Sequence, residues 1–255
     1  MKQTAIITGA TSGIGASFAN KLAAQGYNLV ITGRRKKELQ SLADEIETKQ
    51  KVSVLVQLLD LDDNNQLEKF IKYVKTIDNM GMLVNNAGFG TYDDFWKQEL
   101  SRQEKMVAVH VLATMKLVYG VLPMMIKNKK GFIINVSSLG SFLPLRKNAV
   151  YAGTKAFLTI FTESLHLELL KTGIRVQVLC PGFTRTNFHQ RIDTIQQDMK
   201  ELEKLHWMSA DKVVDCSLAS LRKNRVVCVP GFRNRLIMKI VPFIPRGLYY
   251  RIVQR

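Results

Sequence analysis

The sequence predicts a single-domain α/β protein of the Rossmann type, a doubly wound parallel sheet of about seven strands with helices on both faces. Short β-branched or apolar runs alternate with longer amphipathic segments, which is typical of parallel strands joined by helices. A glycine-rich turn follows the first run, as in nucleotide-binding sheets. The 255 residues suffice for one large domain, and no repeat, low-complexity tract or linker divides them.

The expected strands are the apolar or β-branched runs at residues 4–8, 28–32, 52–58, 82–84, 132–136, 174–179 and 226–229. The expected helices are the amphipathic segments at 14–25, 36–49, 64–76, 101–127, 149–171 and 210–221. Residues 183–208 follow the sixth strand and are polar and irregular in pattern. Because chain that follows a strand in an open α/β sheet borders the ligand crevice, we expect this segment to form a substrate lid.

The composition is that of an ordinary globular protein, with 46% hydrophobic and 23% charged residues. No run of eighteen uncharged apolar residues is present, and we expect no secretory signal. Three cysteines without a C-x-x-C pair argue against a disulfide framework or a zinc site, and no histidine has metal-ligand spacing. We therefore expect a cytoplasmic protein without a metal.

The net charge of +16 is concentrated at the C-terminus, where nine basic residues and no acidic one follow Asp215. Residues 231–255 mix these cations with apolar side chains, and Pro242 and Pro245 divide the segment into two pieces. The segment could pack on the domain or a partner subunit, or it could touch anionic lipid at a membrane surface. Both interpretations remain open. Nucleic acid is not an expected partner, because no groove-reading helix or RNA-binding motif is evident.

A glycine signature, Thr8-Gly9-Ala10-Thr11-Ser12-Gly13-Ile14-Gly15, follows the first expected strand and opens the first helix. In this context Gly9 permits a tight turn, Gly13 lets backbone N–H groups approach a pyrophosphate, and Gly15 lets helix and strand pack closely. The positive end of the helix dipole favours the same ligand. The signature predicts a dinucleotide site that includes Thr11, Ser12 and Ile14, with a purely structural turn as the alternative.

The end of the second strand indicates which dinucleotide is bound. NAD sites commonly place a carboxylate here for the ribose hydroxyls, but this chain has Arg34-Arg35-Lys36-Lys37. Guanidinium groups suit a bidentate contact with a 2′-phosphate. An ordinary basic helix start is the alternative, although cations at a helix N-terminus oppose its dipole. We expect Arg34 and Arg35 to select NADP(H).

Tyr151 and Lys155 lie four residues apart, thirteen residues downstream of Ser138. On a helix this spacing places the phenol and the ammonium on one face. A free tyrosine titrates near pH 10, about 4 kcal/mol from neutrality, and a close cation in a poorly solvated site could supply that difference. The pattern predicts a proton donor and acceptor for a carbonyl or an alcohol. The alternative is an aromatic residue at a helix start with a solvated lysine as its neighbour.

Six motifs stand together in the order of one known family. They are Thr8-Gly9-x-x-x-Gly13-Ile14-Gly15, Asp60 after the third strand, Asn85-Asn86-Ala87-Gly88 after the fourth, Ser137-Ser138 after the fifth, Tyr151-x-x-x-Lys155, and Pro181-Gly182-x-Thr184-x-Thr186 after the sixth. Over about residues 4–190 the chain resembles the short-chain dehydrogenase/reductase family, in its branch of about 250 residues.

The resemblance implies a role for each matching residue. Asp60 and Leu61 would lie against the adenine, and Asn86, Ala87 and Gly88 would run alongside the cofactor. The nicotinamide end would be bordered by Pro181, Gly182, Phe183, Thr184 and Thr186.

In the catalytic part, the resemblance implies that Ser138 hydrogen-bonds the substrate and that Tyr151 is the acid/base. Lys155 would bind the nicotinamide ribose and lower the pKa of the phenol. The chain departs from the family at His110, where an asparagine usually positions a water linked to the lysine. His110 could replace this relay or interrupt it, or it could be a helix-packing residue.

Eight apolar residues fall near the crevice-forming strand ends: Phe89, Phe95, Trp96, Phe142, Leu143, Phe183, Phe188 and Trp207. If half of them line the crevice, the substrate pocket is apolar and wide. We expect an NADP(H)-dependent oxidoreductase acting on a hydrophobic or acyl-type carbonyl and its alcohol. An NADP(H)-binding sensor with impaired catalysis is the alternative. The resemblance also implies a homodimer or homotetramer formed through the helices at 101–127 and 149–171.

Overall fold

The computed structural model describes residues 2–186, 188 and 207–253. Seven parallel strands form one sheet in the order β3-β2-β1-β4-β5-β6-β9. The strands are β1 (Thr4–Thr8), β2 (Asn28–Gly33), β3 (Val54–Leu58), β4 (Met80–Asn85), β5 (Gly131–Val136), β6 (Ile174–Leu179) and β9 (Val227–Cys228). The predicted doubly wound parallel sheet is confirmed.

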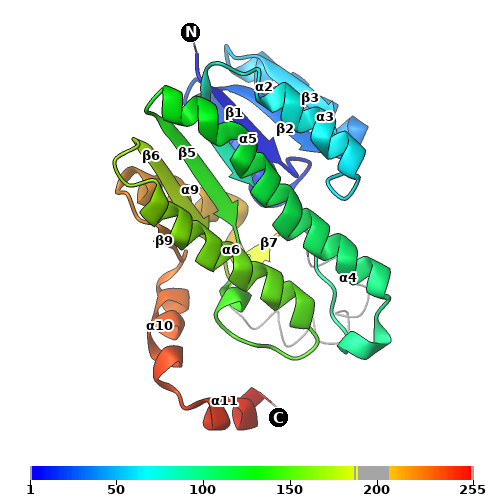
Figure 1. The fold of residues 1–255 in the computed structure, drawn as a ribbon, viewed down its shortest axis with the longest axis vertical. Helices are drawn as coiled ribbons and strands as arrows, with labels where there is room; N and C mark the ends of the chain where they lie inside the picture. The colour runs from blue at the N-terminus through cyan, green and yellow to red at the C-terminus, as the bar shows by residue number, and fades with distance from the viewer. Residues whose placement is uncertain (1, 187, 189–206, 254–255) are drawn as a thin grey trace.

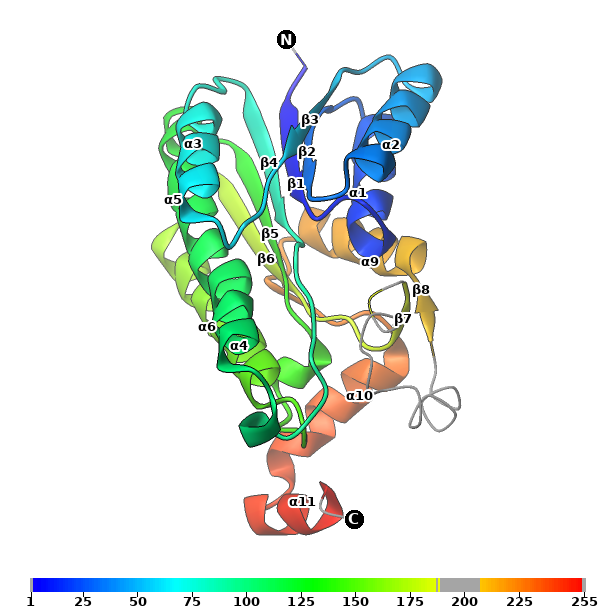
Figure 2. The same cartoon turned by 90° about the vertical axis from the view of Figure 1, so that its right-hand side faces the viewer.

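Helices cover both faces of this sheet, as the side view in Figure 2 shows. One layer contains α1 (Gly13–Ala24), α2 (Lys36–Lys49) and α9 (Ala210–Arg222), and the other contains α3 (Asn64–Val74), α4 (Leu100–Val107), α5 (Ala113–Lys127) and α6 (Ala149–Glu168). A separate hydrophobic core lies on each side, with Phe18 of α1 in one and Leu117 of α5 in the other. Both side chains are fully buried, so the sheet is apolar on both faces, as a parallel sheet requires.

The strand register brings the predicted site segments to one edge. Thr8 at the end of β1 pairs with Thr32 of β2, and Ile7 pairs with Val84 of β4. The chain therefore reverses its winding direction beside β1, and the carboxyl ends of β1, β4 and β5 lie next to one another (Figure 1). Open α/β sheets bind their ligands at such a switch point.

The helix expected at 101–127 has three parts, because a π-helical turn at Ala108–Leu112 separates α4 from α5. Among the described residues, this is the one helical segment apolar enough by composition to cross a membrane, with a mean hydropathy of 1.6 over its best window, half of which is buried. Leu117, Val121 and Met125 are buried in the core between α3, β4 and β5. The segment is therefore accounted for as a core helix.

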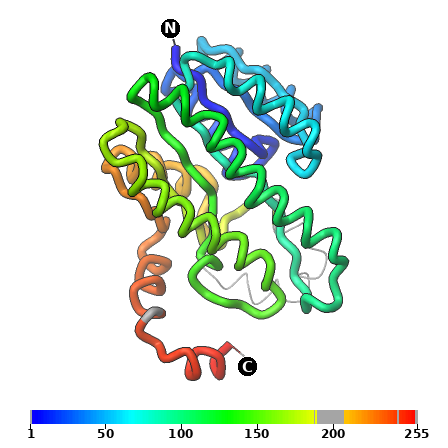
Figure 3. The backbone as a smooth tube through the Cα atoms, in the orientation of Figure 1, coloured from blue at the N-terminus to red at the C-terminus, as the bar shows by residue number. Residues whose placement is uncertain are grey.

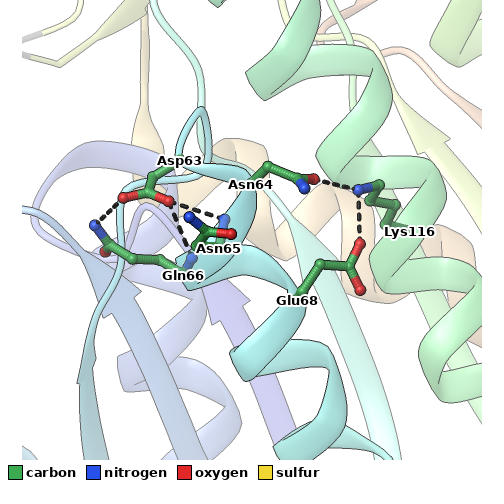
Figure 4. A network of polar contacts seen from close by, with 6 residues as sticks. All are labelled: Asp63, Asn64, Asn65, Gln66, Glu68 and Lys116. Carbon is green, nitrogen blue, oxygen red and sulfur yellow. Dashed lines mark hydrogen bonds and ion pairs between the residues drawn. The ribbon is translucent and has the colours of Figure 1, made fainter.

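Asp63 begins α3 by capping it. Its carboxylate accepts hydrogen bonds from the backbone N–H groups of Asn65 (2.9 Å) and Gln66 (3.1 Å), as Figure 4 shows. Gln66 in turn accepts from the backbone N–H of Asp60 at 3.1 Å. Lys116 of α5 donates to Glu68 of α3 at 2.7 Å and ties the two helices together. The cap thus fixes the turn that holds Asp60 at the carboxyl edge of β3.

The expected substrate lid at 183–208 lies mostly outside the described residues. At its described ends, β7 (Thr184–Arg185) and β8 (Met208–Ser209) form a small parallel pair. The C-terminal segment is divided near its prolines, as expected, into α10 (Phe232–Ile240), a 3-10 turn at Val241–Phe243 and α11 (Arg246–Val253). In Figure 3 these helices continue away from the sheet at one end of the molecule.

Candidate active site

A cleft of about 910 Å³ lies at the carboxyl edge of the sheet. Except for Gly15 and His110, every residue that the sequence nominated for catalysis or cofactor binding lines this cleft: Gly9, Thr11, Ser12, Gly13, Ile14, Arg34, Arg35, Asp60, Leu61, Asn86, Ala87, Gly88, Ser138, Tyr151, Lys155, Pro181, Gly182, Phe183, Thr184 and Thr186. The fold therefore brings together segments that are far apart in the sequence, from Gly9 in the glycine loop to Thr186 after β6.

The glycine loop is held by close contact with the end of β4. The Asn86 side-chain amide donates to the backbone carbonyls of Thr8 and Gly9, both at 3.0 Å. A Cβ on Gly15 would stand 2.3 Å from the Gly9 carbonyl oxygen, and one on Gly9 would stand 2.7 Å from Cα of Ala87. Gly15 is thus required for packing behind the loop, which explains why it does not line the cleft.

The start of α1 has the features of a phosphate site. Gly13 has a positive φ of 59° and opens the helix, and Ser12 does not cap it with its side chain. The first N–H groups of a helix without such a cap, at the positive end of its dipole, suit an anionic ligand. A Cβ on Gly13 would stand 2.7 Å from Thr186, so the segment after β6 closes over the loop. The cradle and the cleft volume of about 910 Å³ fit a dinucleotide.

At one end of the cleft, beside the carboxyl ends of β2 and β3, a basic and an acidic side chain form an ion pair. The Arg34 guanidinium lies 3.6 Å from the Asp60 carboxylate and is 69% exposed. Burial would raise the pKa of Asp60, but a hydrogen bond with Asp62 and the charge of Arg34 together hold it below its usual value. Arg35 turns inward instead and donates to Thr11 at 2.5 Å. Arg34 is therefore the cation that is presented to solvent, while Arg35 braces the glycine loop.

Ser138, Tyr151 and Lys155 meet at the other end. Ser138 follows β5 and hydrogen-bonds the Tyr151 phenol. Lys155 is buried, its Nζ donates to the Val136 carbonyl at 2.9 Å, and it lies 5.7 Å from the centre of the Tyr151 ring. Burial lowers the pKa of Lys155 to about 8. A hydroxyl, a phenol and a poorly solvated amine thus share one pocket with part of the Tyr151 ring open to the cleft.

The expected effect of Lys155 on the pKa of Tyr151 is wrong for the protein without a bound ligand. We expected Lys155 to lower the pKa of Tyr151, but burial raises that pKa, and the hydrogen bond with Ser138 offsets only part of the rise. The physical reason is that Lys155 directs its ammonium to a backbone carbonyl of β5 rather than to the phenol oxygen. The phenol is therefore held in its protonated form at neutral pH.

His110 lies behind the cleft at the centre of the π-helical turn, where such distortions are often functional. Its Nε2 accepts from the backbone N–H of Phe89 at 3.1 Å, so Nδ1 carries the proton and donates to the Thr154 hydroxyl at 2.9 Å. Thr154 then donates to the backbone carbonyl of Tyr151 at 2.8 Å. Burial and the charge of Lys155 hold the pKa of His110 well below its usual value. His110 is therefore a neutral bridge: its two hydrogen bonds join the loop after β4 to α6, the helix that carries Tyr151.

Of the eight apolar residues expected near the crevice, three line it, namely Phe89, Phe183 and Phe188. Phe95 and Trp96 are instead 52% and 78% exposed on a 3-10 turn outside it. Further apolar residues that we did not nominate also line the cleft: Leu59, Val109, Val136, Leu139, Leu145 and Val253. Leu145 and Val253 could not be found from strand ends, because one lies in a long loop and the other in the C-terminal helix.

Several charged residues at the cleft were also missed by sequence reasoning: Asp62, Arg102, Lys105 and Arg146. Asp62 hydrogen-bonds Asp60, which raises the pKa of Asp62, and it lies 3.8 Å from Lys105 of α4. The signal available for Asp62 was the acidic run that begins at Asp60. No comparable signal marks Arg102 or Arg146, which reach the cleft only through the tertiary fold.

Comparison with known proteins agrees with this geometry. The family model described as short chain dehydrogenase matches residues 3–197, and the chain belongs to this family. It is 32% identical over 216 residues to an uncharacterized oxidoreductase of Staphylococcus epidermidis, covering 84% of this chain and 90% of that protein. The chain is therefore an oxidoreductase of the short-chain dehydrogenase type.

A solved short-chain dehydrogenase from Sphingobium yanoikuyae, in complex with NADPH, superimposes with a TM-score of 0.85 at 30% identity, over 96% of this chain and 94% of that one. A very-long-chain 3-oxoacyl-CoA reductase of Coprinopsis cinerea is 37% identical over 177 residues, or 68% of this chain. The match spans about half of that reductase, 52% of its length.

The neutral His110 predicts a pH-dependent stability. The folded state depresses its pKa below the unfolded value of about 6.5, so unfolding takes up a proton below that pH. The free energy of unfolding should fall as the pH is lowered from about 7 toward 5, by up to about 1.4 kcal/mol per unit from this group. Urea denaturation at several pH values in this range measures the free energy of unfolding. This free energy should depend less steeply on pH in His110→Asn than in the wild type.

His166→Asn, which removes a partly exposed histidine from α6, is the matched control and should keep the wild-type slope. Equal slopes in wild type and His110→Asn would contradict the neutral bridge.

Proposed function

We propose that the protein is an NADP(H)-dependent oxidoreductase that interconverts a hydrophobic ketone or aldehyde with its alcohol. The observation that supports this most is the meeting of Ser138, Tyr151 and Lys155 in one pocket of a cleft whose other end has a glycine cradle and Arg34. The nicotinamide, when bound, would supply or accept the hydride. The protein would orient the reactants and manage the proton.

In reduction, the Tyr151 phenol donates its proton to the oxygen of the carbonyl as the hydride reaches the carbon. The phenol is protonated at neutral pH, so it holds the proton that the carbonyl oxygen receives. Ser138 hydrogen-bonds the same oxygen and positions it beside the phenol. Lys155, buried with a pKa of about 8, places positive charge near the tyrosinate that forms, and a proton from solvent restores the phenol.

His110 supports this proton transfer as a positioning residue. It carries no charge at neutral pH, and its two hydrogen bonds join Phe89 to Thr154, whose hydroxyl holds the backbone carbonyl of Tyr151. Its ring also stands edge-on to the Tyr151 ring, with centroids 5.9 Å apart. We therefore assign it the orientation of the Tyr151 helix turn rather than a relay of protons.

Tyr151→Phe tests the acid/base assignment. Removing the phenol oxygen should leave NADPH binding intact and lower kcat by about a hundredfold or more, the usual range for lost general acid catalysis. Binding is measured by NADPH fluorescence, and turnover by loss of nicotinamide absorbance with a panel of aromatic, sterol-like and acyl carbonyls. Turnover at the wild-type level in the variant would refute the role of Tyr151.

The same assay separates the alternative function. Wild-type protein that binds NADPH but turns over nothing across the carbonyl panel would favour a nucleotide sensor with impaired catalysis.

The preference for NADP(H) rests on the cation at the end of β2. Arg34 is exposed at the rim, whereas a site for NAD commonly has a carboxylate in this region. Arg34→Ser should raise KM for NADPH by at least about tenfold and change KM for NADH little, because a charge-assisted contact contributes about 1.5–3 kcal/mol. Steady-state kinetics with both cofactors measures this split.

Lys36→Ser is the control, since Lys36 is an exposed neighbouring cation that does not line the cleft. Two results would count against a 2′-phosphate contact: a similar rise in KM for NADPH in both variants, or an equal rise in KM for NADPH and NADH in Arg34→Ser.

We propose that the substrate is a bulky apolar molecule with an acyl-type or aromatic carbonyl. Phe89, Phe188 and Leu145 give it apolar walls, and Arg102 and Arg146 stand among its lining residues. The 3-oxoacyl-CoA reductase among the relatives acts, by its name, on a substrate of this kind.

A homo-oligomer is the proposed assembly. Leu112, Met115 and Tyr119 are 49%, 40% and 73% exposed on one face of the π-helical turn and α5. Phe157 and Ile160 are 37% and 64% exposed on one face of α6, at a spacing typical of a helix-packing surface. Figure 1 shows α5 and α6 side by side on the same face of the molecule. Association would bury this apolar surface.

Light scattering should give the mass of a dimer or tetramer for the wild type. Ile160→Arg should shift it toward the monomer, because an interface core excludes unpaired charge. Leu55→Arg, at a 42% exposed position on β3, should leave the mass unchanged. A monomeric wild type would exclude the assembly.

A further inference from the structure

The C-terminal arm, residues 231–253, has few contacts with the domain. None of the described side chains of α10 is buried. Asn234 packs on Gly182, where a Cβ would stand 2.7 Å from its Nδ2, and so holds the first turn. Tyr249 of α11 is buried and donates to the Pro144 carbonyl at 2.8 Å. In Figures 1 and 2 the helices α10 and α11 extend from the body of the molecule.

An apolar stripe runs along the solvent side of the arm. Phe232, Leu236, Ile240 and Phe243 are 74%, 46%, 51% and 86% exposed. Their spacing of four, four and three residues places them on one face of α10 and the turn that follows. On a globular domain such large apolar side chains would normally face the core. Four exposed apolar side chains on one face indicate a surface that contacts a membrane or another protein.

Cations flank this stripe. Arg233, Arg235 and Lys239 are exposed on α10, and Arg246 and Arg251 are exposed on α11. The sequence has no carboxylate after Asp215 to balance them. An amphipathic helix with an apolar stripe, a basic flank and no acidic residue fits an anionic bilayer surface, where apolar burial and attraction to lipid phosphates act together. Arm-to-arm pairing of two copies would instead bring like charges together.

One side of α11, which carries Tyr249 and Val253, faces the body of the molecule at the candidate active site. Tyr249 donates a hydrogen bond to the loop at Pro144, and Val253, one helical turn further on, lines the cleft, as Leu145 and Arg146 do. Leu248 and Ile252, on the neighbouring face of the same helix, are 52% and 57% exposed. The arm therefore connects an outward apolar surface with the substrate end of the cleft.

We propose that the C-terminal arm docks the protein on anionic phospholipid bilayers through the stripe Phe232, Leu236, Ile240 and Phe243 and its flanking cations. Docking places the substrate end of the cleft at the bilayer surface, from which an apolar carbonyl can enter. This lipid contact is a property additional to the proposed oxidoreductase activity and does not depend on that activity. Only the delivery of substrate rests on that function.

Vesicle flotation of the full-length protein tests the docking. The protein should float with vesicles of equimolar phosphatidylglycerol and phosphatidylcholine, bind phosphatidylcholine vesicles much less, and dissociate as salt is raised. Arg235→Gln/Lys239→Gln should lower the partition coefficient by about thirtyfold, from the usual contribution of two cations near an anionic surface. Phe243→Ser should lower it by about tenfold or more through lost apolar burial.

Lys69→Gln/Lys72→Gln is the matched control, because it removes the same charge from exposed positions on α3 and should float as the wild type does. Circular dichroism and light scattering on each variant establish that fold and subunit number are unchanged. Three results would overturn the proposal: no flotation with anionic vesicles, an equal loss in the α3 variant, or a change of subunit number in the arm variants. NADPH turnover of a water-soluble ketone, measured separately, reports on the oxidoreductase alone.

Discussion

The close approach of the turn after β1 to the end of β4 is the constraint on which the site depends. Asn86 donates to two carbonyls of this turn, and the contact is possible because Gly9 and Gly15 have no side chain to separate the backbones. It fixes the start of α1 at the switch point of the sheet. The N–H groups of that helix then face the cleft, and the rest of the site is arranged around them.

The catalytic end shows how packing determines charge. Lys155 is buried against β5 with its ammonium on a backbone carbonyl, while His110 is buried neutral on the other side of α6. Each is held by hydrogen bonds, because an unpaired polar group in this interior would be costly. One result is that Tyr151 is a protonated phenol in the protein alone.

The molecule is also asymmetric along its length. Acidic residues occur along the sequence as far as Asp215, whereas every charged side chain of the terminal arm is basic. This arm touches the body through Asn234 and Tyr249 and contributes Val253 to the cleft. The element that is most distant from the sheet in the fold thereby reaches the place where substrate would bind.

Most of the fold and much of the site were determined by local signals in the sequence. Apolar or β-branched runs predicted the strands, and β1 and β6 begin and end at the predicted residues. Every residue of β1 is buried, because a strand covered on both faces favours an unbroken run of apolar or β-branched side chains. Glycines next to a strand and a helix marked the phosphate cradle, since few other residues tolerate that backbone. The tertiary structure alone decided what depends on approach between distant segments: the neutral state of His110, the direction of Lys155, and the arrival of Leu145 and Val253 at the cleft. Such contacts and burial arise only when separate segments pack, so no short stretch of sequence carries them.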